Sequence, residues 1–192
     1  MKRLHSLIAL AVVAMLGIAT VGQAQVPEMP KPTEQHELLK QFAGKWRVAA
    51  ETVPAPGMEA MKIEGTETSE MVGGFWLVSK GESTMEGMPM RSVLTIGYDP
   101  AVKKYIGTFF CSADSTLWKY EGEMDESGKK LTLMTEGPSP IEPGKQAKYR
   151  EVLELKDKDH KVFTSYLQDA EGGWITFVTM QYERVKQPKP KQ

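Results

Sequence analysis

The most constraining feature of the sequence is a series of turn signals that divides residues 44–185 into short segments of strand character. Turns such as Gly73-Gly74, Asp99-Pro100 and Gly172-Gly173 recur at the short spacing of an up-and-down β protein. No helical pattern after Gly44 is long enough for a βαβ unit, which argues against a parallel sheet. We expect about ten strands, over residues 46–53, 58–72, 75–84, 90–98, 104–111, 116–124, 130–136, 147–155, 161–168 and 174–185.

One short helix is expected ahead of these strands. Thr33 is placed to cap it, Leu38, Leu39 and Phe42 share one side, and Gly44 ends it. Short connections favour sequential antiparallel pairing, and closing such a sheet removes its exposed edges. We therefore predict an all-β fold, an antiparallel up-and-down β-barrel of about eight to ten strands with one short N-terminal helix. A β-sandwich would show the same alternation of polar and apolar residues.

The first residues are typical of a secretory signal peptide. Lys2 and Arg3 precede an apolar run over residues 7–21, and small residues up to Ala24 suit cleavage before Gln25. A membrane anchor is the alternative, but the run is short for a span and no basic stop-transfer cluster follows it. We expect a periplasmic or secreted protein without a stable membrane anchor. The predicted organisation is a signal peptide over 1–24, a flexible leader over 25–33, the barrel over 34–186 and a disordered tail over 187–192.

Composition and charge narrow the classes of function. The formal net charge of −1 gives no electrostatic case for binding nucleic acid or an anionic membrane. Cys111 is the single cysteine, so an intramolecular disulfide is impossible, and its apolar neighbours suit a small buried hydrophobe. His36 and His160 stand apart from each other without a zinc-ligand spacing, and we interpret both as surface residues. No cofactor is expected.

The motifs of the common hydrolases are absent from the sequence, including Gly-x-Ser-x-Gly and His-Glu-x-x-His. Glu64, Glu67 and Glu70 recur every three residues on an expected strand, so they alternate between its faces. We interpret them as solvated charges. These observations favour a non-catalytic protein over an enzyme.

Two sets of residues resemble known families. Gly44-Lys45-Trp46, directly after the expected helix, resembles the Gly-x-Trp signature of the lipocalin-like (calycin) barrels. That resemblance implies that Trp46 closes one end of the barrel and that Arg184 packs over its ring by cation–π stacking. It gives Gly44, Trp46 and Arg184 structural roles.

The second set is Gly97-Tyr98-Asp99-Pro100, Lys104-Tyr105 and Tyr120-Glu121-Gly122, with Gly73-Gly74-Phe75 ahead of it. In order and spacing it resembles an uncharacterised bacterial family, domain of unknown function 1579, over residues 34–185. The resemblance implies a fold and supplies no catalytic residues.

The expected barrel suggests a binding role. A barrel of about eight strands is wide enough to hold one small ligand, and additional strands widen the lumen. We predict an exported, non-catalytic binder of a small, largely apolar molecule, with Arg91, Arg150 and Tyr149 as polar groups that orient it if they face inward. The alternative is a non-enzymatic envelope or interaction protein whose barrel is filled. The candidate lining residues are aromatic and lie on expected strands: Trp76, Phe109, Trp118, Tyr120, Tyr149, Tyr166 and Phe177.

Three methionines form a less favoured candidate site. Met85, Met88 and Met90 give a Met-x-x-Met-x-Met spacing across one turn. Thioethers are soft ligands that select Cu(I), but methionine also fills irregular space in a core. The sequence leaves the oligomeric state open.

Overall fold

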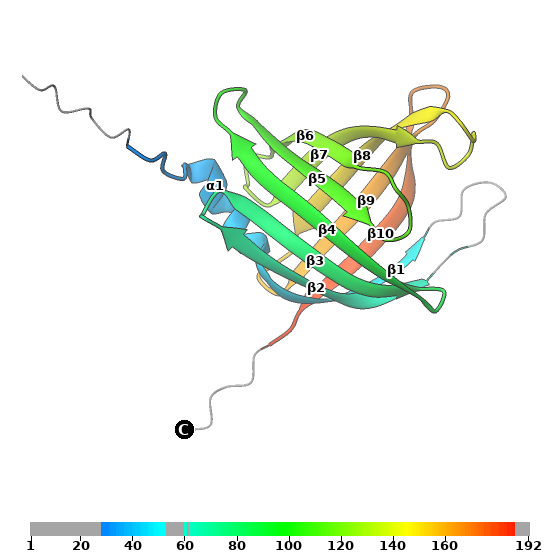
Figure 1. The fold of residues 1–192 in the computed structure, drawn as a ribbon, viewed down its shortest axis with the longest axis horizontal. Coiled ribbons are helices and arrows are strands. Elements are labelled where there is room, and N and C mark those ends of the chain that lie inside the picture. Colours follow the sequence, from blue (N-terminus) through cyan, green and yellow to red (C-terminus); the bar gives the residue numbers. More distant parts are fainter. Residues whose placement is uncertain (1–27, 53–59, 61, 187–192) are drawn as a thin grey trace, which may run out of the picture. The chain divides into compact units, whose positions relative to one another are not determined.

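The computed structural model describes residues 28–52, 60 and 62–186. Within these ranges, ten β-strands follow one short helical segment (Figure 1). The strands lie close to the expected ranges, and the fifth coincides with its range. Their bounds are β1 (Gly44–Thr52), β2 (Lys62–Val72), β3 (Trp76–Met85), β4 (Met88–Asp99), β5 (Lys104–Cys111), β6 (Trp118–Met124), β7 (Lys130–Pro138), β8 (Gln146–Leu155), β9 (His160–Gln168) and β10 (Trp174–Arg184).

The strands form a closed antiparallel barrel. Each strand pairs with its successor in sequence, and β1 pairs with β10 to complete the ring. Around that ring β3 therefore lies opposite β8, because four strands separate them on either side. The predicted up-and-down barrel is confirmed, and no sheet edge is left unpaired among the described strands.

The helical segment packs at one end of the barrel, against β3 and β4 (Figure 1). It consists of α1 (Glu34–Leu39) and a 3₁₀ turn, η1 (Lys40–Phe42), as the sequence predicted for residues 34–42. Leu39 and Phe42 are fully buried, so the apolar side of this segment covers the barrel end. The indole N–H of Trp46 donates to the Phe42 carbonyl at 3.1 Å, which ties the start of β1 to the turn.

His36 is buried, so its assignment to the surface was wrong. Its Nδ1 accepts a hydrogen bond from the Thr33 backbone N–H at 3.0 Å, which caps the helix. Its ring packs edge-on against Phe75 and Tyr98, with ring centroids 5.2 and 5.8 Å away. The hydrogen bond at the start of the helix and the contacts with two aromatic rings therefore bury His36, which the sequence led us to expect on the surface.

Beneath the helical segment the barrel is filled. The inward side chains here are large and apolar, and each such side chain contributes roughly 1.5–3 kcal/mol on burial. The phenol of Tyr105 donates to the Gln35 carbonyl at 3.0 Å, so its polar tip is satisfied. The main members of this core are Leu77, Ile96, Tyr105, Leu131, Leu155 and Tyr182.

The predicted signal peptide, the first three residues of the predicted leader and the tail from residue 187 lie outside the described residues. In the part of the chain that the structure does describe, no helix has the length and apolar character needed to cross a membrane.

Candidate functional site

A cavity of about 290 Å³ lies in the lumen, beyond the filled end of the barrel. Small inward residues on one wall create it, because Gly81, Ser83 and Ser92 on β3 and β4 leave space opposite β8. Larger side chains on the facing wall, such as Tyr149 and Leu153, do not reach across. The lumen of this barrel is therefore partly empty.

Five of the predicted lining residues border this cavity: Phe109, Trp118, Tyr120, Tyr149 and Phe177. Trp118 and Tyr149 meet edge-to-face with centroids 5.0 Å apart, and Phe177 follows 6.3 Å from Tyr149. The Tyr149 hydroxyl donates to a backbone carbonyl at 2.6 Å, which fixes the ring. These aromatic contacts give the cavity a rigid apolar wall.

A glycine on the neighbouring strand makes room for this wall. A Cβ at Gly137, on β7, would overlap the six-membered ring of Trp118. Any larger residue at position 137 would displace the indole from its place beside Tyr149.

The other three predicted lining residues, Trp76, Arg150 and Tyr166, lie outside the lumen, which corrects their assignment. Arg150 alternates with the inward Tyr149 on β8, and its guanidinium carbon lies 4.4 Å from the Tyr166 ring centroid. It also lies 4.9 Å from the ring of Trp174. Trp76 is 42% exposed and packs over Gly97 on the outer surface. On its strand, each of these three residues alternates with the residues that line the cavity, so its side chain points away from the lumen.

Glu151, which the sequence analysis did not single out, is the most unusual residue of the lining. Its side chain is on the inner face of β8, and the residue is only 6% exposed. One carboxylate oxygen, Oε1, accepts a hydrogen bond from the Ser165 hydroxyl at 3.0 Å. The other, Oε2, is buried and has no partner among the described residues.

Burial dominates the electrostatics around Glu151. Desolvation raises the pKa of its carboxyl to about 8, and the hydrogen bond from Ser165 opposes this only in part. The pKa of Tyr149 is raised to about 12 and that of Tyr120 still further, mainly by burial and additionally by the charge of Glu151. Tyr149 and Glu151 stand two residues apart on the inner face of β8, and Tyr120 borders the same cavity.

Glu67 and Lys161 form a second buried polar group, which corrects the interpretation of Glu67 as a solvated charge. Lys161 Nζ lies 2.5 Å from Glu67 Oε1, and the two side chains are 2% and 12% exposed. Ser69 donates to the same carboxylate at 2.7 Å. Burial lowers the pKa of Lys161, and the charge of Glu67 opposes that shift. The pair neutralises the one carboxylate that projects into the lumen from β2.

The ammonium group of Lys161 also contacts two aromatic rings. It lies 4.5 Å from the Trp46 centroid and 4.6 Å from that of Tyr182. Strand register explains this grouping, because Trp46 pairs with Glu67 on one side and with Arg184 on the other, while Tyr182 pairs with Lys161. Lys161 is therefore held as part of the closed end of the barrel.

Arg184 lies over the outer face of this group, in the position that the resemblance to Gly-x-Trp barrels implied. Its guanidinium carbon is 3.9 Å from the Trp46 centroid. Nη1 donates to the Ala43 carbonyl at 2.6 Å, and Nη2 donates to the Gln41 carbonyl at 3.1 Å. Gly44 has a φ of 133°, and a Cβ there would overlap this guanidinium. Through these contacts the last strand, β10, is joined to the start of the first strand, β1, around the indole of Trp46.

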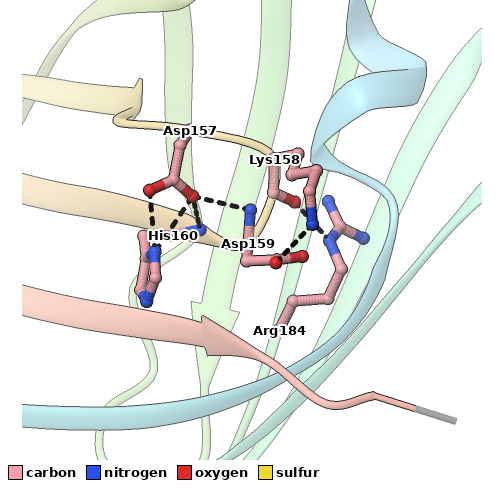
Figure 2. A network of polar contacts seen from close by, with 5 residues as sticks. All are labelled: Asp157, Lys158, Asp159, His160 and Arg184. Carbon is pink, nitrogen blue, oxygen red and sulfur yellow. Dashed lines mark hydrogen bonds and ion pairs between the residues drawn. The ribbon is translucent and has the colours of Figure 1, made fainter.

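The turn between β8 and β9 supports Arg184 from the side, because Nε donates to the Lys158 carbonyl at 2.7 Å (Figure 2). Asp157 organises this turn by accepting the backbone N–H of Asp159 at 2.7 Å and that of His160 at 2.8 Å. The His160 ring bonds the same carboxylate at 2.9 Å and is the main reason that the pKa of Asp157 is lowered. His160 is exposed, as predicted, and acts within the turn.

The methionines of the β3–β4 hairpin share one face. Met85 pairs with Met88, and Met90 pairs with Ser83, so all three point to the lumen side at the rim. Met90 borders the cavity, while Met88 is 62% exposed. A Cu(I) site here stays a prediction. Among the described residues, no group of three or more His, Cys, Asp or Glu side chains is placed to hold a metal ion.

Comparison with known proteins extends the resemblance seen in the sequence. The model of the family described as protein of unknown function (DUF1579) matches residues 31–184. No curated protein matches the chain.

Among solved structures, the crystal structure of Rv2717c from M. tuberculosis matches with a TM-score of 0.60 and 11% identity, over 81% of this chain and 100% of that one. At this identity the likeness concerns the fold alone. A redesigned β-barrel, mFAP0, solved bound to DFHBI, matches with a TM-score of 0.41 and 9% identity, over 75% of this chain and 99% of that one.

Proposed function

We propose that this chain, which belongs to the DUF1579 family of proteins of unknown function, binds a small, largely apolar molecule inside its barrel. One observation carries the proposal, namely the cavity of about 290 Å³ with its wall of aromatic side chains. Ligand sites are commonly concave and apolar, with a few polar groups that orient the bound molecule. The alternative of a barrel filled with side chains does not fit a lumen with this much empty space.

The proposed role is non-catalytic. The Ser165 hydroxyl donates to the Glu151 carboxylate, and the described lining residues include neither histidine nor cysteine to complete a nucleophilic group. The other polar lining groups include the hydroxyls of Ser83 and Ser92, which suit hydrogen bonding to a ligand.

Export is part of the proposal. The basic start, apolar run and small residues before Gln25 support a secretory signal that is removed. Fractionation of the native host followed by N-terminal sequencing tests this. A mature chain that begins at Gln25 outside the cytoplasm is expected, whereas an intact N-terminus in the cytoplasm would contradict export.

Binding is tested by native mass spectrometry of the protein purified from its host and by titration with the neutral dye Nile red. Two adjacent substitutions on β3 provide the comparison, because Ser83 faces the cavity and Thr84 is exposed on the outer face. Ser83→Phe should fill the cavity and abolish a co-purified molecule and dye binding. Thr84→Phe should leave both unchanged. Equal binding by the two variants would refute a site within the lumen.

A further inference from the structure

Three carboxylates and no basic side chain border the cavity among its described lining residues. Glu67 is neutralised by Lys161, and Asp114 is exposed, where water screens its charge. Glu151 differs from both, because it is buried and no lysine or arginine in the described part of the chain pairs with it. The lining therefore disfavours an anionic ligand and contains one buried acidic group without a counter-ion.

The unpartnered oxygen of Glu151 is the second, independent observation. A buried polar atom without a hydrogen-bond partner is costly, and native structures rarely retain one without a reason. Oε2 of Glu151 is such an atom, and it belongs to a residue that borders the cavity. A hydrogen-bond donor on a bound molecule would satisfy this oxygen.

From these observations we propose that the ligand is an amine with an apolar body, whose ammonium group pairs with the Glu151 carboxylate. This deepens the proposed function and rests on it. The phenol rings of Tyr120 and Tyr149, which border the same cavity, add aromatic faces that attract a cation. The apolar body of the ligand packs against Phe109 and Trp118.

The pairing has a defined dependence on pH. In the absence of a ligand, burial raises the pKa of the Glu151 carboxyl to about 8, so this group is mainly protonated at neutral pH. It must therefore release its proton when an ammonium group binds. Affinity for the amine therefore rises as the pH approaches that value. Burial raises the pKa values of Tyr120, Tyr149 and Tyr182, which also border the cavity, so these phenols stay uncharged at that pH. Burial lowers the pKa of Lys161, which pairs with Glu67 and is not one of the described lining residues.

The test uses three probes with one apolar body: aminoadamantane, adamantanol and adamantane carboxylate. Calorimetric titration should give the amine an affinity about tenfold or more above that of the alcohol, and the carboxylate should bind most weakly. The substitution Glu151→Gln keeps the shape of the side chain and should remove the preference for the amine and its rise with pH. Adamantanol binding should stay unchanged in this variant, which also shows that the variant is folded.

Glu154→Gln is the matched control, because Glu154 lies on the same strand with the opposite phase and pairs with Lys156 at 2.8 Å. It should bind all three probes as the unaltered protein does. Binding of the alcohol as tightly as the amine, or an amine preference that survives Glu151→Gln, would overturn the inference while leaving a ligand-binding cavity. Failure of all three probes and of Nile red would instead refute the proposed function.

Discussion

Replacing Lys161 with methionine removes the cation of the buried pair and keeps most of the side-chain volume. Glu67 then loses its contact at 2.5 Å and keeps only the hydrogen bond from Ser69. Breaking a buried ion pair from one side typically costs about 3–5 kcal/mol, because the remaining charge is left uncompensated. The rings 4.5 and 4.6 Å from Nζ lose a cation as well, which places the expected loss toward the upper half of that range.

Urea unfolding of a double-mutant cycle measures this coupling. The cycle comprises Lys161→Met, Glu67→Gln and the double variant. The double variant should recover much of the loss and lie within about 1–2 kcal/mol of the unaltered protein, because it leaves no unpaired charge. Coupling would be refuted if Lys161→Met cost less than about 1 kcal/mol and the single effects added within about 0.5 kcal/mol.

An exposed pair supplies the control for the cycle. Lys156 and Glu154 lie 2.8 Å apart, with side chains 51% and 34% exposed. Exposed pairs of this kind contribute about 0–1 kcal/mol, so Lys156→Met should change the free energy of unfolding by no more than that. A loss as large as that of Lys161→Met would show that burial is not what distinguishes the two pairs.

Three further substitutions test the core and the cavity. Trp46→Ala should lower the free energy of unfolding by about 3–5 kcal/mol in urea titrations, because the indole is fully buried. Since burial raises the pKa of Glu151 to about 8, the folded state binds the extra proton, so stability relative to Glu151→Gln should be greatest in acid and fall as the pH rises to about 8. Gly137→Ala should cost roughly 1–3 kcal/mol and alter the near-ultraviolet circular dichroism of Trp118, because the new Cβ overlaps its ring. An unchanged Trp46→Ala midpoint, a pH-independent difference for Glu151→Gln, or an unchanged spectrum for Gly137→Ala would each contradict the packing described.

The strands and turns were predictable because they depend on local patterns. Turn residues and alternation mark where a strand begins and ends, and β5 matched its expected range. Alternation also assigns residues to two faces, but it does not say which face is the inner one when both carry aromatic side chains. That is why Trp76 and Arg150 were grouped with Tyr149 although they lie on the outer surface.

Irregular strand geometry defeats the pattern in a second way. A register shift between Thr176 and Val178 in β10 breaks the alternation of the strand. Phe177 and Val178 are neighbours in sequence, and yet both border the cavity. A bulge of this kind depends on the pairing with neighbouring strands, so the local sequence does not predict it.

The buried charges were missed because their environment is assembled from distant strands. Glu67 on β2 meets Lys161 on β9, 94 residues later. Glu151 is buried because the ring of strands closes around the inner face of β8, while its neighbours in sequence include Arg150, which points outward. A charged residue on a strand of alternating polarity is usually exposed to solvent. Which charged side chains are buried becomes clear only from the three-dimensional structure of the closed barrel.

The contact between Arg184 and Ala43, 141 residues apart in the chain, has a consequence for how the protein is made. Because β10 closes the ring onto β1, a nascent chain cannot complete its barrel until its last strand has left the ribosome. Closure across so long a separation makes folding slow relative to helical domains of similar size. Until then, the edges of β1 and of the most recently synthesised strand remain unpaired. The incomplete chain can therefore associate edge to edge with another chain during its synthesis, whereas the closed barrel offers no such edge.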